Sequence, residues 1–250
     1  MLFHLLPLIG YKRKQNQLDA MDSEQMKCVI FDCEGTLVDS EKLCCQALVS
    51  VFNCYGAELS MDEALSHFNG GKLADILVQT SQRLGVKVDI DELEPLYREK
   101  TRVLFQDQLR PCKNAVKVLD TLKQHGIEVC VVSNGPRSKL EYTLEISGLS
   151  DYFKGAMFSA FDANSWKPDP DLIQYAAMRM GFRAKECLFV DDTLQGIRAG
   201  VAANITTLHY RPNPLSPKWS AEGAMSISDL SEVLEYCADV PPLEYHISLR

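Results

Sequence analysis

Strand-length apolar runs recur along this chain, and helical patterns separate them. The runs span residues 27–31, 128–132, 155–159, 187–190 and 205–208, and most of their residues are β-branched or aromatic. Near-continuous apolarity of this kind is typical of strands that are buried on both faces of a parallel sheet. Residues 113–126 and 170–181 have helical spacing, and each segment ends at a glycine. The alternation predicts an α/β fold with a doubly wound, Rossmann-like parallel sheet.

One long interval lacks strand-like sequence. Between residues 41 and 106 only helical segments are recognisable, at 41–54, 61–67, 72–84 and 91–106. A helical block that interrupts an α/β series predicts an inserted, all-helical cap domain; the alternative is an enlarged crossover packed permanently on the sheet. We therefore expect an α/β core at 25–40 and 107–240 and a helical cap at 41–106. We also expect a poorly ordered N-terminal extension at 1–24, a helix near 227–237 and a C-terminal tail at 241–250.

Charge and cysteine content narrow the classes of function. The net charge of −8 argues against nucleic acid as a main partner, because binding to the phosphate backbone needs clustered lysine and arginine. The nine cysteines are scattered and form no Cys-x-x-Cys pair, which favours reduced thiols in the cytoplasm over a disulfide framework. The opening apolar stretch of about ten residues is too short to span a bilayer. We expect no stable membrane association, with a peripheral membrane contact as the alternative.

Polar side chains follow the predicted strands at the point where each strand ends. Any one of them could be a helix cap or a turn residue. Because ligands of open α/β sheets bind at the carboxyl ends of the strands, we expect these side chains to meet at one edge of the sheet. They are Asp32 and Glu34 after the first strand, Ser133 after the second, Lys167 in the loop after the third, and Asp191 with Asp192 after the fourth.

The chemistry of this set is consistent with phosphoryl transfer. Several carboxylates without histidine or cysteine ligands make a hard-oxygen site of the kind that Mg²⁺ prefers. A lysine beside such a metal neutralises a phosphoryl group, and backbone amides at a helix start near Asn134 favour the same anion. Phosphoryl transfer needs mainly positioning and charge neutralisation, and a carboxylate can act as the nucleophile through an aspartyl-phosphate.

The same residues, in this order, resemble the motifs of the haloacid dehalogenase superfamily. The motifs read DCEGT, VVSNG, KPDP and DDTLQG, and the resemblance covers residues 27–238. The helical block after the first motif is similar to the C1 cap of the β-phosphoglucomutase-like group. Within that group, the stretches FDCEGTLVDSE, VVSNGP and WKPDP are similar to those of bacterial 6-phosphogluconate phosphatases.

The resemblance implies roles for the acidic residues. Asp32 would attack phosphorus and also ligate Mg²⁺. Glu34 would protonate the leaving oxygen and later activate water, while its backbone carbonyl binds the metal. Asp192 would be a direct metal ligand, and Asp191 would support it.

The resemblance also implies how substrate is held. Ser133 and Asn134 would hydrogen-bond the phosphoryl oxygens, and Lys167 would balance charge between phosphate and nucleophile. Gly35 would let the backbone turn tightly beside the phosphate. In the cap, Lys72 would meet a second anionic group of the substrate; the alternative is a solvated lysine at a helix start.

The reaction implied is hydrolysis of a small phosphorylated sugar or sugar acid by a cytoplasmic, Mg²⁺-dependent phosphatase, a monomer or weak homodimer. Mutases of the group carry a histidine twelve residues after the nucleophile, where this chain has Cys44, so hydrolysis is favoured over mutase turnover. Glu34 stands where the family motif has aspartate. It keeps open a weakly active or inactive relative that binds a phosphorylated metabolite or a protein partner; a sugar-phosphate mutase is the further alternative.

Overall fold

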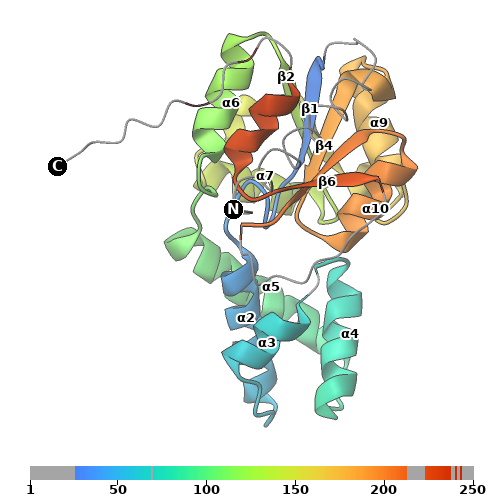
Figure 1. The fold of residues 1–250 in the computed structure, drawn as a ribbon. Coiled ribbons are helices and arrows are strands. Elements are labelled where there is room, and N and C mark those ends of the chain that lie inside the picture. Colours follow the sequence, from blue (N-terminus) through green and yellow to red (C-terminus); the bar gives the residue numbers. More distant parts are fainter. Residues whose placement is uncertain (1–25, 69, 213–222, 238–239, 241–242, 244–250) are drawn as a thin grey trace, which may run out of the picture.

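The structure, a computed structural model, describes residues 26–68, 70–212, 223–237, 240 and 243. It has an α/β part and a helical part that lie one beyond the other (Figure 1). The N-terminal extension expected at 1–24 and nearly all of the tail expected at 241–250 lie outside the described residues.

The α/β part is built on a six-stranded sheet with the order β3-β2-β1-β4-β5-β6. Every neighbouring pair of strands is parallel, which confirms the predicted doubly wound α/β class. The sequence predicted five of the strands. The sixth was missed because it is a four-residue edge strand with partly exposed side chains, which leaves no apolar run to recognise. The strands are β1 (Cys28–Asp32), β2 (Glu128–Ser133), β3 (Met157–Ser159), β4 (Cys187–Asp191), β5 (Thr206–Tyr210) and β6 (Ala224–Ile227).

Helices cover both faces of this sheet (Figure 1). In β1, Val29 and Phe31 belong to one core cluster and Cys28 and Ile30 to another, because successive strand residues point to opposite faces. The predicted final helix is the 3₁₀ helix η3. On the first face lie α6 (Ala115–Gln124), α7 (Arg137–Ile146) and η3 (Leu230–Tyr236); on the second lie α9 (Asp171–Met180) and α10 (Leu194–Ala202). Short elements are η1 (Ser150–Tyr152), α8 (Ala160–Ala163) and η2 (Ala184–Glu186).

The helical part follows β1 and lies beyond the carboxyl ends of the strands (Figure 1). It has a core of its own, in which the side chains of Phe52, Leu77 and Leu93 are fully buried. A cap would have to lie beyond the carboxyl ends of the strands, and this helical part, with its separate core, lies there. Its helices are α2 (Glu41–Cys54), α3 (Met61–His67), α4 (Leu73–Leu84) and α5 (Ile90–Gln108).

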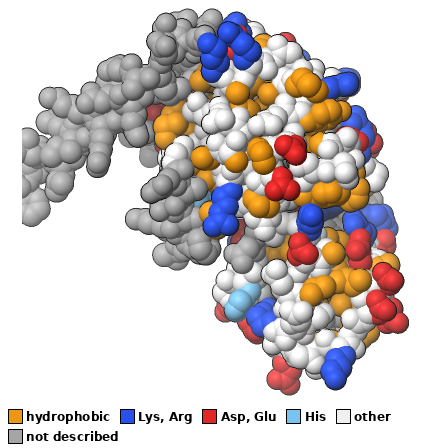
Figure 2. Space-filling model, turned by 90° about the vertical axis from the view of Figure 1, so that its right-hand side faces the viewer, with side chains coloured by type: hydrophobic (Ala, Val, Ile, Leu, Met, Phe, Trp, Pro, Cys, Tyr) orange, Lys and Arg blue, Asp and Glu red, His pale blue; other side chains and the backbone are white. Residues whose placement is uncertain are grey.

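The state of the cysteines and the distribution of charged side chains on the surface are consistent with the composition. All nine cysteines lie within the described residues and are free thiols, most of them buried. Figure 2 shows lysine and arginine side chains interspersed with acidic and hydrophobic ones on one face of the molecule. Among the described helices, none combines the length and the apolar character that a membrane span needs.

Candidate active site

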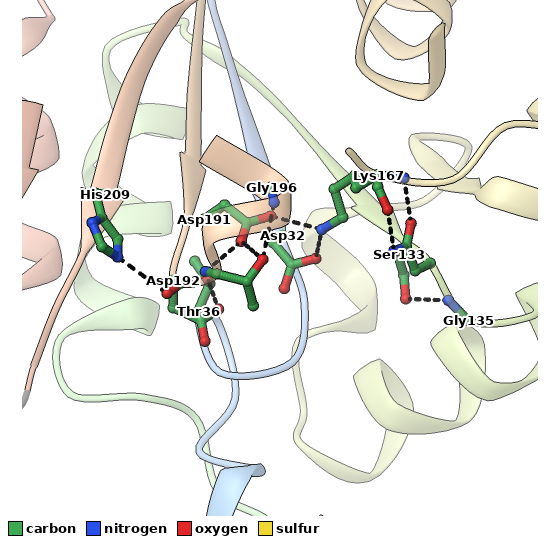
Figure 3. A network of polar contacts seen from close by, with 11 residues as sticks. Asp32, Thr36, Ser133, Gly135, Lys167, Asp191, Asp192, Gly196 and His209 are labelled. Carbon is green, nitrogen blue, oxygen red and sulfur yellow. Dashed lines mark hydrogen bonds and ion pairs between the residues drawn. The ribbon is translucent and has the colours of Figure 1, made fainter. Parts of the chain in front are cut away.

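Lys167 contacts two buried carboxylates at the carboxyl edge of the sheet (Figure 3). Its Nζ donates to Oδ1 of Asp32 at 2.5 Å and to Oδ2 of Asp191 at 2.6 Å. Burial lowers the pKa of Lys167, but Asp191 and Asp32 raise it by more, and the net direction is upward. Strands β1 and β4 are neighbours, which brings their terminal aspartates to the same lysine.

A third carboxylate, Asp192, completes the cluster. Burial raises the pKa of Asp192, and Asp191 and Asp32 raise it further. Burial likewise raises the pKa of Asp32, against the lowering effect of Lys167. Lys167 contacts Asp32 and Asp191, whereas Asp192 accepts a hydrogen bond from the Thr36 hydroxyl at 2.8 Å. One ammonium group is thus set against three neighbouring carboxylates, which leaves an excess of negative charge when all three are ionised.

This donor set fits a divalent cation. Carboxylate oxygens of Asp32, Asp191 and Asp192 lie within 4.8 Å of one another. Hard oxygen ligands at this spacing suit Mg²⁺, and a cation there would offset the negative charge that Lys167 leaves unbalanced.

Two glycines allow the acidic residues to lie this close to the backbone. A methyl group on Gly196, the third residue of α10, would lie 1.9 Å from Cγ of Asp191, so this close approach needs a glycine. Gly35 has a φ of +90°, and a methyl group there would lie 2.3 Å from Oδ2 of Asp192. Thr193 caps α10 and also donates to Oδ1 of Asp191 from its backbone N–H and its hydroxyl, each at 2.7 Å.

The residues after β2 lie on the other side of Lys167 (Figure 3). Ser133 is buried at the end of the strand, and its Oγ accepts from the backbone N–H of Gly135 at 3.0 Å. The side chain of Asn134 accepts from the Lys167 backbone N–H at 2.9 Å and donates to the Lys167 carbonyl at 3.2 Å. Asn134 therefore fixes the loop that carries the lysine, a role that its place in the sequence did not suggest.

Glu34 pairs with a residue that sequence reasoning missed. Lys139 of α7 donates to Oε2 of Glu34 at 2.7 Å, and its Nζ is equally close to Oε1. Burial lowers the pKa of Lys139, but the charge of Glu34, the hydrogen bond to it and the neighbouring thiols together raise this pKa by more, so the net direction is upward. The available signal was a lysine in the first turn of a helix, where the helix dipole disfavours a cation.

The loop before α4 brings the helical part against the sheet edge. Methyl groups on Gly70 and Gly71 would lie 2.9 Å from Thr193 and 2.8 Å from Gln195, so both glycines lie against the start of α10. The Nζ of Lys72 lies 4.6 Å from the ring centroid of Trp166, the residue that precedes Lys167. Sequence reasoning selected Lys72 but missed this aromatic partner.

Comparison with known proteins matches residues 29–210 to the family of haloacid dehalogenase-like hydrolases. The 6-phosphogluconate phosphatase of Escherichia coli K12 is 34% identical over 190 residues, which cover 76% of this chain and 85% of that protein. The fructose-1-phosphate phosphatase YqaB of the same organism is 30% identical over 196 residues, covering 75% of this chain and 98% of that one.

A solved structure shows the same fold. CbbY from Rhodobacter sphaeroides, solved in complex with phosphate, superposes with a TM-score of 0.73 and covers 85% of this chain and 99% of its own. Its sequence identity is 16%, so the likeness concerns the fold.

Proposed function

Because this chain belongs to the haloacid dehalogenase-like hydrolase family, we propose that it releases phosphate from a small phosphorylated sugar or sugar acid with the help of Mg²⁺. It is an enzyme of the phosphoric monoester hydrolase class, as are its relatives named as phosphatases. The observation that carries the proposal is Asp32, held by Lys167 beside two further aspartates at the end of β1.

Asp32 is the nucleophile in this proposal. Lys167 holds its Oδ1, and Oδ2 is the oxygen that we assign to attack on phosphorus, forming an aspartyl-phosphate. Glu34, two residues on, donates a proton to the leaving oxygen of the substrate. The same carboxylate then accepts a proton from the water that hydrolyses the aspartyl-phosphate.

The phosphoryl group would lie between Lys167 and the turn after β2. The hydroxyl of Ser133 and the backbone amides at Asn134 and Gly135 are the donors that we assign to its oxygens. Since the Asn134 side chain is engaged with Lys167, the Asn134 contact with phosphate would come from its backbone.

Mg²⁺ would be held by Asp32 and Asp192, supported by Asp191, with the backbone carbonyl of Glu34 as a further oxygen. When bound, the ion would neutralise charge on the phosphoryl group and on the aspartates. Gly35 lets the chain turn at this point, where a side chain would collide with Asp192.

Lys72 supports a substrate with a second anionic or strongly polar group. It is exposed on the loop that contacts the sheet edge, close to Trp166. A sugar acid that carries phosphate at one end and carboxylate at the other matches Lys167 and Lys72. The E. coli relative named for 6-phosphogluconate points to the same class of substrate.

Two other functions remain as alternatives. A weakly active or inactive protein that binds a phosphorylated metabolite or a protein partner is motivated by Glu34, which stands where the family motif has aspartate and pairs with Lys139. A mutase would need a proton-transferring group at Cys44, whose side chain is 3% exposed and whose pKa burial raises to about 12. A buried thiol of that kind is poorly suited to this role.

The direct test is phosphate release from a panel that contains 6-phosphogluconate, fructose 1-phosphate and pyrophosphate, with Mg²⁺ or with EDTA. We expect Mg²⁺-dependent release from at least one sugar phosphate. Asp32→Asn should reduce it by more than about a hundredfold, as expected for loss of a nucleophile. The exposed Asp39 provides a matched control, and Asp39→Asn should leave the rate nearly unchanged. No release from any substrate, or full activity of Asp32→Asn, would contradict the proposal.

A further inference from the structure

Glu34 and Lys139 form an ion pair at the edge of the site. The ammonium nitrogen lies 2.7 Å from each oxygen of the carboxylate. The side chains retain 23% and 30% of their exposure, so the pair is partly shielded from water and reachable from the site. Glu34 follows β1 and Lys139 is in α7, so the contact joins segments that are 105 residues apart.

Lys139 has neighbours on two sides besides Glu34. It lies in the first turn of α7, its aliphatic chain lies beside Gly135, and its Nζ is 5.8 Å from the ring centroid of Phe105 in α5. A methyl group on Gly135 would be 3.6 Å from Cδ of Lys139, which is ordinary contact distance. Lys139 thus lies between the turn after β2, which contains Gly135, and helix α5 of the helical part.

The position is electrostatically unfavourable for a lysine without a partner. The N-terminus of a helix favours anions, and the first turn of α7 contains no acidic residue of its own. Glu34 supplies the compensating charge. In return, Lys139 offsets the repulsion between the carboxylates of Glu34 and Asp32, which act on each other across the site.

We propose that Lys139 is a positioning residue that holds the Glu34 carboxylate in place for proton transfer, and that the two residues work as a unit. The proposal rests on the proposed function, in which Glu34 moves the proton. It also explains why this chain has glutamate here. Aspartate is shorter by one C–C bond, about 1.5 Å, and with the backbone unchanged it would no longer reach Lys139.

The test is a double-mutant cycle in steady-state hydrolysis of whichever panel substrate is turned over. Lys139→Met should lower kcat roughly ten- to a hundredfold with KM within about twofold, because a displacement of about 1 Å costs on the order of a hundredfold in rate. Glu34→Gln should lower kcat by about a hundredfold or more. In the Glu34→Gln background, Lys139→Met should have almost no further effect, since its partner for proton transfer is already gone.

Three comparisons separate positioning from other roles. Lys139→Arg should recover part of the lost kcat, because it restores a cation that can reach Glu34. Glu34→Asp should lose about as much kcat as Lys139→Met. The matched control is Lys154→Met, which removes an exposed lysine paired with Asp151 and should leave kcat unchanged. Thermal melting checks that each variant folds, and Lys139→Gln replaces the methionine variant if that one does not.

Several results would overturn the proposal. If Lys139 binds the substrate itself, its loss raises KM and remains costly in the Glu34→Gln background. A faster Glu34→Asp enzyme would show that the pair does not position the proton donor. If wild-type protein releases no phosphate from any substrate, the proposed function fails instead. The Glu34–Lys139 interaction is then tested alone by urea unfolding of wild type, Glu34→Gln, Lys139→Met and the double variant. If the changes in the urea midpoint of the two single variants do not add up to that of the double variant, the interaction is supported; if they do, it is contradicted.

Discussion

Replacing Lys167 by methionine tests whether the buried charge cluster is balanced as the structure indicates. The lysine makes contacts of 2.5 and 2.6 Å to Asp32 and Asp191, and all three residues are at most 6% exposed. At an effective dielectric constant of about 20, each contact corresponds to about 6 kcal/mol of attraction. Most of this lost attraction is offset, because the variant no longer buries a charged lysine and because the aspartates can take up protons. We expect a net loss of about 3–5 kcal/mol in the free energy of unfolding, as for other broken buried pairs.

The pH dependence of this loss has a definite sign. Asp32 and Asp192 have raised pKa values in the folded protein, so above the ordinary aspartate pKa, near 4, the folded state binds more protons than the unfolded state. Metal-free stability therefore falls as pH rises through this window. Removing Lys167 raises both pKa values further, so the variant should lose more stability at about pH 8 than at about pH 5.

The assay is urea unfolding in EDTA at both pH values, followed by circular dichroism. Lys154→Met is the control for removal of a lysine, because its partner Asp151 is equally exposed and little change is expected. Mg²⁺ should recover more stability in Lys167→Met than in wild type, since the cluster then has no cation of its own. A Lys167→Met protein as stable as wild type, or one with equal losses at both pH values, would refute the reasoning.

Three further outcomes are expected. Gly196→Ala should lower the free energy of unfolding by about 1–3 kcal/mol in thermal melts, because the new methyl group collides with Asp191. Gly196 lies inside α10 and is not among the glycines with positive φ, so the collision is not compounded by a backbone penalty. Lys72→Ala should raise KM about tenfold for a substrate with a second anionic group and leave kcat nearly unchanged, as steady-state kinetics would show. Mg²⁺ should raise the melting temperature of wild type but have a much smaller effect on Asp192→Asn.

The cluster of Asp32, Asp191 and Asp192 was predictable because the direction of the strands determines where their terminal residues lie. Asp32 and Asp191 end parallel neighbouring strands, so they must meet at the same sheet edge wherever the connecting chain runs. Lys167 was predictable from its place in a loop that returns to that edge. These inferences need only strand order and the carboxyl ends of strands, which apolar runs and polar stops reveal.

Side-chain direction was not predictable in the same way. Asn134 follows a buried serine and resembles a phosphate contact, yet its amide is directed at the Lys167 backbone. Glu34 is two residues from Asp32, but a partner 105 residues away sets the orientation of its carboxylate. Such choices depend on which distant groups packing brings within hydrogen-bond reach, and a linear pattern does not contain that information.

The loop before α4 connects the helical part to the residues around the aspartate cluster. Gly70 and Gly71 lie on Thr193 and Gln195, and Thr193 in turn donates two hydrogen bonds to Asp191. The position of this loop is therefore linked to the cluster through Thr193.

Lys72 has an exposed side chain on that loop, so we expect a substrate to engage it without moving Gly70 and Gly71. Its contact with the Trp166 ring is worth about 0.5–1 kcal/mol at an exposed site, whereas a hydrogen bond to a charged group is worth about 1.5–3 kcal/mol. An anionic group should therefore draw the ammonium from Trp166, while Gly70 and Gly71 keep the loop on the sheet edge. Trp166→Leu should consequently tighten substrate binding slightly, because the competing contact is gone. A markedly higher KM in that variant would instead make Trp166 part of the binding surface.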